Sequence, residues 1–182
     1  MEEDELIKRA KEGDLDCFNQ LVERYQREVY NLSLRMLGNA SAAEDASQDA
    51  FLSAFRGIGK FRGGSFRAWL YRIAANACRD QLRSLRRRPA TSIDSLPLEL
   101  ESDQPSPEDF AMRRELGEEI KRALAALPPD QRLAVILRDI EGLDYEEIAQ
   151  VTGSSLGTVK SRINRGRARL RHHLEQRREL FP

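Results

Sequence analysis

The side chains best suited to chemistry in this sequence follow a tight turn near its C-terminus. Asp144 with Glu147 matches a capping box, in which each residue satisfies a backbone N–H group at the start of a helix. Gly153 stands where a tight turn needs a permissive backbone, and Ser154 or Ser155 can cap a second helix. A short capped helix, a glycine turn and a second helix predict a helix-turn-helix.

The second of these helices divides into an apolar stripe and a polar face. The stripe expected to be buried comprises Leu156, Val159, Ile163 and Leu170, with Gly166 lying on it. The opposite face presents Thr158, Lys160, Ser161, Arg162, Asn164 and Arg165. Small polar and arginine side chains can read base edges in the major groove, so we expect this face to bind DNA. A helical hairpin with a solvated basic face is the alternative.

A second basic block covers residues 51–90, which carry 10 Lys or Arg against a single acidic residue. Aromatic residues are interleaved with it, a pattern that suits single-stranded nucleic acid because bases stack on rings while phosphates pair with arginine. Trp69, Leu70 and Ile73 have helical spacing and are expected to be core. Phe61 and Phe66 flank Gly63-Gly64 and are expected in an exposed loop, available for contact.

An acidic helix face precedes this basic block. Asp45, Gln48, Asp49 and Leu52 fall on one face of a predicted helix, while alanines fall on another: Ala46, Ala50 and Ala54. Such a face is ill-suited to DNA but suits a basic protein partner. A solvated face without a partner is the other interpretation.

The apolar spacing predicts an all-α protein. Helices are expected over residues 15–37, after an Asp14 cap, and from a Ser41–Glu44 capping box to about residue 56; two more are expected over about 66–87 and 130–140. Residues 91–112 hold six acidic and no basic residues, with three prolines, and predict a flexible acidic linker. The expected architecture is two small helical domains, 1–90 and 113–182, joined by this linker.

Several classes of function are excluded by what the sequence lacks. It has no apolar stretch long enough for a membrane span, and its acidic N-terminus is unlike a secretory signal, so a cytoplasmic location is expected. Cys17 and Cys78 lie far apart without histidines nearby, and we expect neither a disulfide nor a metal site. There is no nucleophile elbow or phosphate-binding loop, so neither an enzyme nor a cofactor is expected.

Four stretches of the sequence resemble bacterial sigma factors of the extracytoplasmic-function type. They are the segment from Ala43 to Phe51 with the continuation from Phe61 to Asn76; Leu127-Pro128-Pro129-Asp130-Gln131-Arg132; and Gly157-Thr158-Val159-Lys160-Ser161-Arg162. The resemblance covers nearly the whole chain. A helix-turn-helix regulator with an N-terminal sensor or dimerisation domain is the alternative. It accounts for residues 113–175 but not for the basic, aromatic block or the acidic face.

The resemblance implies roles for particular residues. The acidic face would bind the clamp helices of the polymerase β′ subunit through Asp45, Gln48, Asp49 and Phe51. The melted −10 element would be held by Phe61, Arg62, Gly63, Gly64, Ser65, Phe66 and Arg67, and by Asn76, Arg79, Asp80 and Arg83 on the following helix. The −35 duplex would be read by the face that runs from Thr158 to Arg165.

Further partners follow from the same resemblance. The first half of the helix-turn-helix would approach the polymerase β flap, the linker would thread the polymerase near the RNA exit route, and an anti-sigma factor would hold the protein inactive. Asn164 and Gly166 stand where some relatives carry an aromatic residue and an alanine, so the −35 sequence is not carried over. No role is assigned to His172-His173 or to the tail that follows.

Overall fold

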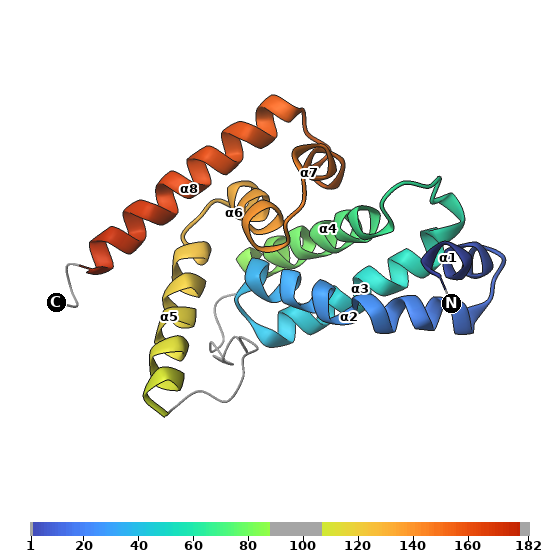
Figure 1. Cartoon of the computed structure of the whole chain (residues 1–182), viewed down its shortest axis with the longest axis horizontal. Helices are drawn as coiled ribbons and strands as arrows, with labels where there is room; N and C mark the ends of the chain where they lie inside the picture. The colour runs from blue at the N-terminus through green and yellow to red at the C-terminus, as the bar shows by residue number, and fades with distance from the viewer. Residues whose placement is uncertain (1, 88–106, 179–182) are drawn as a thin grey trace.

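The computed structural model describes residues 2–87, the N-terminal half, and residues 107–178, the C-terminal half. Every secondary-structure element in these two ranges is a helix (Figure 1). The elements are α1 (Glu3–Lys11), α2 (Leu15–Leu37), α3 (Ala40–Gly57), a 3₁₀ turn (Ile58–Lys60), α4 (Phe66–Arg87), α5 (Pro107–Ala125), α6 (Pro129–Val135), a π-helical turn (Ile136–Ile140), α7 (Tyr145–Thr152) and α8 (Leu156–Arg178). The prediction of an all-α protein with two helical domains is therefore confirmed.

Local signals set the ends of the first long helices. Asp14 caps α2 by accepting a hydrogen bond from Cys17 N at 3.0 Å, and Gly38 ends the helix in the left-handed region with φ of 66°. The cap of α3 is Asn39, which accepts from Ala42 N at 2.8 Å, so the predicted Ser41 cap was wrong by two residues. The shift has a physical reason: the Asn39 side chain sits directly after the glycine stop and reaches the first free N–H groups.

The core of the N-terminal half lies where α2, α3 and α4 pack together, with α1 laid across α2. The alanine face of α3 is fully buried, as the spacing predicts, and it allows α2 and α4 to approach closely. Helix α1 was not predicted. It contributes Leu6 and Ile7 to this core, and the hydroxyl of Tyr25 on α2 donates a 2.6 Å hydrogen bond to Glu3.

The C-terminal half is organised by a close approach of α8 to α6. A Cβ added at Gly166 would stand 2.5 Å from Cγ2 of Val135 and 3.2 Å from the carbonyl oxygen of Gln131. Helix α5 begins at Pro107, so residues 107–112 are helical although they fall inside the predicted linker. Proline at the first helical position and the acidic residues Glu108 and Asp109 in the first turn both favour a helix start there. The rest of the linker lies outside the described residues.

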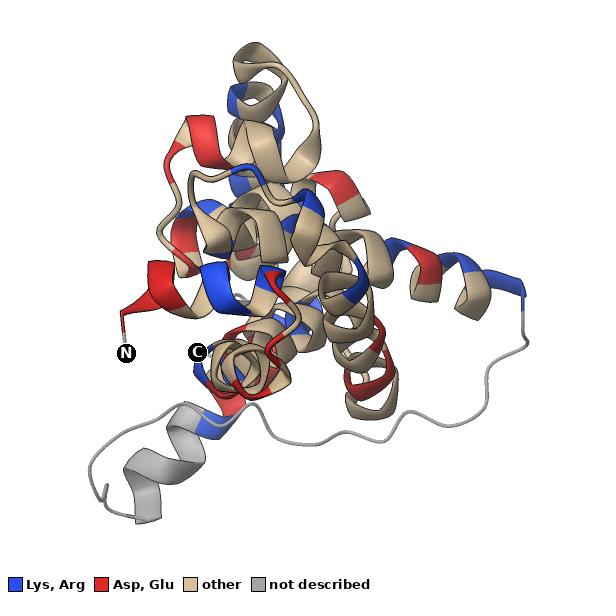
Figure 2. Ribbon diagram, turned by 90° about the vertical axis from the view of Figure 1, so that its right-hand side faces the viewer, with Lys and Arg blue, Asp and Glu red and all other residues tan. Residues whose placement is uncertain are grey.

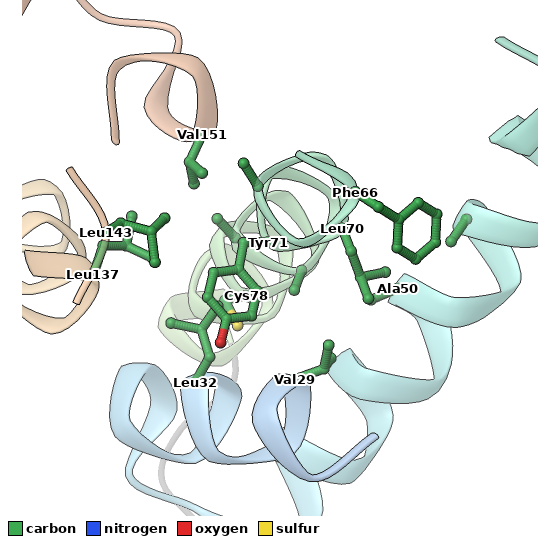
Figure 3. Close-up of a cluster of buried hydrophobic side chains, with 14 of the residues drawn as sticks. Val29, Leu32, Ala50, Phe66, Leu70, Tyr71, Cys78, Leu137, Leu143 and Val151 are labelled. Carbon is green, nitrogen blue, oxygen red and sulfur yellow. The ribbon is translucent and has the colours of Figure 1, made fainter. Parts of the chain in front are cut away.

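The two halves share one continuous buried cluster. Helix α4 lies between α2 and α3 on one side and α7 on the other (Figure 1). Figure 3 shows Leu137, Leu143 and Val151 of the C-terminal half facing Tyr71 of α4, whose other side meets Leu32 of α2. Each of these side chains is at most 2 % exposed. The halves are thus in apolar contact.

No helix within the described residues is both long enough and apolar enough to cross a bilayer.

Candidate protein and nucleic-acid interfaces

The acidic face of α3 is open to solvent. Asp45, Gln48 and Asp49 are exposed, and Phe51 is half-buried one turn further on. Because α3 buries its alanines, its polar residues are forced outward on the opposite side. The predicted protein-binding residues therefore lie together on one accessible surface.

An apolar groove of about 930 Å³ lies between α2 and α3, beside this acidic face. Gln48 and Phe51 line it, and so do Leu15, Leu52 and Phe55, which are 55 %, 53 % and 43 % exposed. Leu52 was placed on the acidic face, but Leu15 and Phe55 were missed. Three large apolar side chains exposed in one groove are typical of a surface that a protein partner covers.

The loop after the 3₁₀ turn differs from expectation in its aromatic residues. Phe61 and Phe66 are buried, at 7 % and 3 % exposure, and their rings pack on each other and on Trp69 with centroids 5.4–5.5 Å apart. The prediction that both rings lie in an exposed loop was wrong, because their apolar area completes the core under α1. The exposed part of this loop is Arg62 with Gly63 and Gly64, whose φ angles are 99° and 87°.

Helix α4 places its predicted DNA-binding residues toward its C-terminal end, which projects from the helical body (Figure 2). Asn76, Asp80 and Arg83 are exposed. Arg79 donates to the Asn76 side chain at 3.1 Å, and Arg83 pairs with Asp80 at 2.7 Å. The helix therefore presents a basic, hydrogen-bonding surface.

The helix-turn-helix forms as predicted in its first part. Asp144 and Glu147 make both hydrogen bonds of the capping box, at 2.7 and 3.0 Å, and Gly153 is left-handed with φ of 63°. Ser155 caps the second helix, accepting from Thr158 N at 3.2 Å. Val159, Ile163 and Gly166 are buried, but Leu156 is 41 % exposed. Its burial was predicted wrongly, because it stands at the first position of α8, beyond the packed surface.

The predicted DNA-reading face of α8 is accessible in part. Lys160, Asn164 and Arg165 are exposed, whereas Thr158, Ser161 and Arg162 are half-buried. Arg162 donates to Ser154 Oγ at 2.7 Å, and it also pairs with Asp130 of α6 at 3.2 Å. These two contacts fix the Arg162 side chain against the turn before α8 and against α6.

Asp130 connects the two predicted DNA-binding surfaces. Its Oδ2 receives Arg162 of α8, and its Oδ1 receives Arg79 of α4 at 3.5 Å. One carboxylate thus contacts an arginine from each half of the chain. Asp130 lies in one of the stretches that resemble sigma factors, but the sequence assigned it no role. No local sequence pattern shows that α4 and α8 meet at α6.

Glu141 forms a second bridge between the halves, at a site where its side chain is only 7 % exposed. It pairs with Arg35 at 2.9 Å and Arg67 at 3.1 Å, and it accepts a 2.6 Å hydrogen bond from Tyr71. Arg67 also pairs with Glu28 at 2.7 Å. Arg67, predicted to bind DNA, is consequently engaged between two carboxylates.

Arg132 makes the most buried polar contact between the halves. Its guanidinium donates to the carbonyl oxygens of Ala125 at 2.8 Å and Leu127 at 3.0 Å, and to that of Met36 at the end of α2. Burial lowers the pKa of Arg132. The side chain joins the end of α5 to the end of α2, a positioning role that the motif alone did not reveal.

The described residues contain no group of His, Cys, Asp and Glu side chains arranged to hold a metal ion. Cys17 and Cys78 are both buried free thiols in separate helices. These thiols belong to the apolar core and lie away from the surfaces described above.

Comparison with protein families finds two matches in chain order. Residues 21–88 match the model of sigma-70 region 2, and residues 117–170 match the model of sigma-70 region 4. The first match covers most of α2, α3 and α4 with the loop between them. The second covers the C-terminal part of α5 and continues through α6 and α7 into α8.

Individual proteins show the same likeness. The chain is 41 % identical over 163 residues to the ECF RNA polymerase sigma factor SigE of Mycolicibacterium smegmatis, covering 88 % of this chain and 62 % of that protein. It is 40 % identical over 170 residues to the ECF RNA polymerase sigma-E factor of Escherichia coli, covering 89 % of this chain and 88 % of that protein.

Two solved structures resemble the fold. One is CnrH in complex with the cytosolic domain of CnrY, with a TM-score of 0.72 and 28 % identity, covering 94 % of this chain and 96 % of that chain. The other is the sigma factor RpoE in complex with the anti-sigma factor NepR from Bartonella quintana, with a TM-score of 0.70 and 28 % identity, covering 87 % and 96 %.

Proposed function

This chain belongs to the sigma-70 family, in its extracytoplasmic-function group, and from that premise we propose that it is a dissociable specificity subunit of RNA polymerase. It binds core polymerase in the cytoplasm and directs initiation at particular promoters. Its contribution is selective binding, and the polymerase carries out the bond chemistry. The observation that carries this proposal is that one exposed acidic face, on α3, is followed along the same chain by two exposed basic surfaces, on α4 and α8.

The acidic face of α3 is the proposed contact with the β′ clamp helices. Asp45 and Asp49 supply the negative charge, and Gln48 with Phe51 continues the contact into the apolar groove. Charge attraction would speed the encounter, and the buried apolar area would hold the complex. The first half of the helix-turn-helix is proposed to approach the β flap.

The −10 element is proposed to bind along the exposed loop and α4 as melted single strand. Arg62, Gly63 and Gly64 present an accessible edge, and Asn76, Arg79 and Arg83 extend it along one helix. Since Phe61 and Phe66 are buried, we assign them the role of supporting the loop from beneath. Glycine at the two left-handed positions lets the backbone approach an unstacked base closely.

The −35 element is proposed to bind as duplex on α8. Lys160, Asn164 and Arg165 stand on the exposed face of a helix that a capping box, a glycine turn and a serine cap hold in place. Polar side chains at the start of such a helix reach base edges in the major groove, while flanking arginines contact phosphates.

An anti-sigma factor is the proposed inhibitor. RpoE of Bartonella quintana was solved bound to its anti-sigma factor NepR, and the likeness to that chain suggests a comparable partner here. The groove between α2 and α3 offers that partner an apolar binding site, and the polymerase clamp would bind at the same site. Competition for this one groove would be sufficient for inhibition.

A stand-alone helix-turn-helix regulator is the competing function. It would use α6 to α8 in the same way but would leave the acidic face and the apolar groove without a purpose. The deciding experiment is size-exclusion chromatography of the full chain with bacterial core RNA polymerase at physiological salt. A stoichiometric complex that another sigma factor displaces supports the proposal. A folded chain that stays apart from core polymerase would overturn it in favour of the regulator.

A further inference from the structure

The polar face of α8 contains side chains of two kinds, those that are bonded within the protein and those that are free. Thr158 Oγ1 lies 3.0 Å from Ser155 Oγ, and Ser161 Oγ donates to the carbonyl oxygen of Thr158 at 3.2 Å. Arg162 donates to Ser154 Oγ at 2.7 Å. These groups hold the start of α8 and the turn before it, so they are engaged before any DNA arrives.

The other residues of this face are exposed: Lys160, Asn164 and Arg165. The Lys160 ammonium lies 5.8 Å from the centroid of the Tyr145 ring. The side chains of Asn164 and Arg165 make no hydrogen bond or ion pair with any residue in the ranges that the structure describes. Their donors and acceptors are therefore available to a ligand.

Asn164 carries a group that distinguishes one base from the other three. Its carboxamide offers a donor and an acceptor side by side. In the major groove adenine presents the acceptor N7 beside the donor N6–H₂, so one asparagine can make both hydrogen bonds with it at once. Guanine presents two acceptors, O6 and N7, which suit the donor fork of an arginine. The two free side chains thus match two different purines.

We propose that Asn164 is the specificity-determining residue for an adenine in the −35 element, and that this adenine neighbours the base pair read by Arg165. The inference rests on the proposed function, because it names a base that the −35-binding face selects. The family resemblance does not supply this base, since some relatives carry an aromatic residue at the position of Asn164.

The spacing of the two side chains favours readout of neighbouring base pairs. Asn164 and Arg165 are consecutive, and consecutive Cα atoms are about 3.8 Å apart. Consecutive base pairs are separated by about 3.4 Å along the duplex. Both residues lie in the first half of α8, and the N-terminal part of a recognition helix is the part that contacts base edges.

The packing of α8 fixes the position from which these side chains extend. Gly166 follows them directly, and an added Cβ there would stand only 2.5 Å from Val135 of α6. Val159 and Ile163 are fully buried in the apolar stripe of the same helix. Figure 1 shows α8 along the outer edge of the molecule, with α6 beneath it. A side chain on a rigidly packed helix keeps the geometry that a bidentate contact needs.

The test first lets the holoenzyme identify its −35 sequence. Core polymerase with the wild-type full chain selects promoter duplexes from DNA that is random across the −35 region. Each adenine of the selected element is then replaced in turn by 7-deazaadenine, which lacks the N7 acceptor, and holoenzyme binding is measured by fluorescence anisotropy. Loss of one hydrogen bond should weaken wild-type binding about two- to twelvefold at one of these adenines.

Asn164→Ala is the test variant, and Gln176→Ala is its matched control. Both changes remove an exposed amide from α8, but the Gln176 amide lies 3.0 Å from a ring nitrogen of His172, near the end of the helix. Asn164→Ala should bind the normal and the 7-deazaadenine duplex equally. Its preference for adenine over the other bases should fall about five- to 150-fold. Gln176→Ala should keep the wild-type preference at every position.

Asn164→Asp is a second test variant that keeps the shape of the side chain. It replaces the amide donor by a second acceptor, which would face adenine N7 without a proton between them. The adenine preference should therefore be lost in this variant as well, although the side chain still fills the same space.

An Asn164→Ala holoenzyme with the wild-type preference at every position would overturn the proposal, as would wild-type binding that no 7-deazaadenine weakens. Equal losses of affinity for Asn164→Ala on the selected and a scrambled duplex would also overturn it, because the amide would then contact the DNA backbone. Failure of the wild-type chain to form a holoenzyme would instead overturn the proposed function. The free chain would then select the duplex, and the same variants would test the adenine contact.

Discussion

The hydroxyl of Tyr71 donates a 2.6 Å hydrogen bond to Oε2 of Glu141, joining α4 to the segment that precedes the helix-turn-helix. Burial raises the pKa of Tyr71, so its hydroxyl remains a proton donor at any physiological pH. The same oxygen receives Arg67 at 3.1 Å. Tyr71 lies on α4, between the proposed −10 loop and the DNA-binding residues further along the helix, and one carboxylate thereby couples it to the C-terminal half.

Tyr71→Phe should loosen this coupling while keeping the apolar seam. A hydrogen bond to a charged group contributes about 1.5–3 kcal/mol, so the free energy of unfolding should fall by about that amount. Denaturant unfolding followed by circular dichroism measures the change. Tyr145→Phe is the matched control, because the Tyr145 hydroxyl has no hydrogen-bond partner within the described ranges. Equal losses for the two variants would contradict the assignment.

Reversing charge on the α3 face should separate polymerase binding from DNA binding. Asp45→Lys combined with Asp49→Lys is expected to weaken association with core polymerase by more than about tenfold, because like charges would then meet across the interface. Both residues are exposed and make no ion pair within the described residues, so folding should be unaffected. Co-elution with core polymerase measures the effect. Glu23→Lys, on the exposed side of α2, should co-elute normally, and unchanged binding of the double variant would disprove the role of this face.

Much of the fold was predictable because its signals are local. The bounds of α2 and α4 follow from apolar spacing, and the helix-turn-helix follows from Asp144, Glu147 and Gly153, whose partners lie within a few residues. The burial of Phe61 and Phe66 was not predictable in the same way. Two glycines between them indicate an exposed loop, and only the tertiary position of α1 and α2 turns the rings inward.

The contacts between the halves were beyond sequence reasoning for the same physical reason. Asp130 and Arg79 are 51 residues apart, and Arg67 and Glu141 are 74 apart. Charged residues at such separations carry no periodic signal. Arg67 was assigned to DNA by the family resemblance and Arg162 by its place on the polar face of its helix, and neither source shows their internal partners. An arginine side chain indicates that a phosphate, a base edge or a carboxylate can bind there. It does not indicate which carboxylate of the folded chain lies nearby.

Gly166→Ala should destabilise the C-terminal half. The added Cβ would stand 2.5 Å from Val135 Cγ2 and 3.2 Å from a backbone oxygen of α6, so α8 would have to move. Overpacking of this kind costs about 1–3 kcal/mol. A thermal melt measures it, at about 2–4 °C for each kcal/mol in a chain of this size. Gly157→Ala is the control, since its Cβ would meet only Ser155 Oγ at 4.0 Å, and an equal drop in both variants would refute the packing argument.

Cys78 should make stability fall at high pH. Burial raises the pKa of its thiol to about 11, above the value of about 8.5 for a free cysteine. Between these two values the unfolded chain releases a proton that the folded chain retains, so unfolding is increasingly favoured as pH rises. Cys78→Ala removes this contribution. The wild-type chain should therefore lose more stability than the variant between about pH 8.5 and 11 in denaturant titrations, and parallel curves would show that the thiol is not shielded.

Arg165 should contribute sequence-specific affinity on α8. It is exposed beside Asn164, without an ion pair in the described part of the chain, and so its guanidinium is free to pair with a guanine edge. Arg165→Ala should weaken the binding free energy by about 1–3 kcal/mol on a −35 duplex that the wild-type holoenzyme has selected from random DNA. The loss on a scrambled duplex should be much smaller. The measurement is anisotropy across a salt series on both DNAs.

Arg171→Ala provides the comparison, because Arg171 is exposed two turns further along α8. If it contacts only phosphate, it should lower affinity equally on both duplexes and reduce the salt slope by about 0.9. The same equal loss for Arg165→Ala would reassign Arg165 to the DNA backbone. Base reading on α8 would then have to come from Lys160 and Asn164, the other exposed side chains on this face.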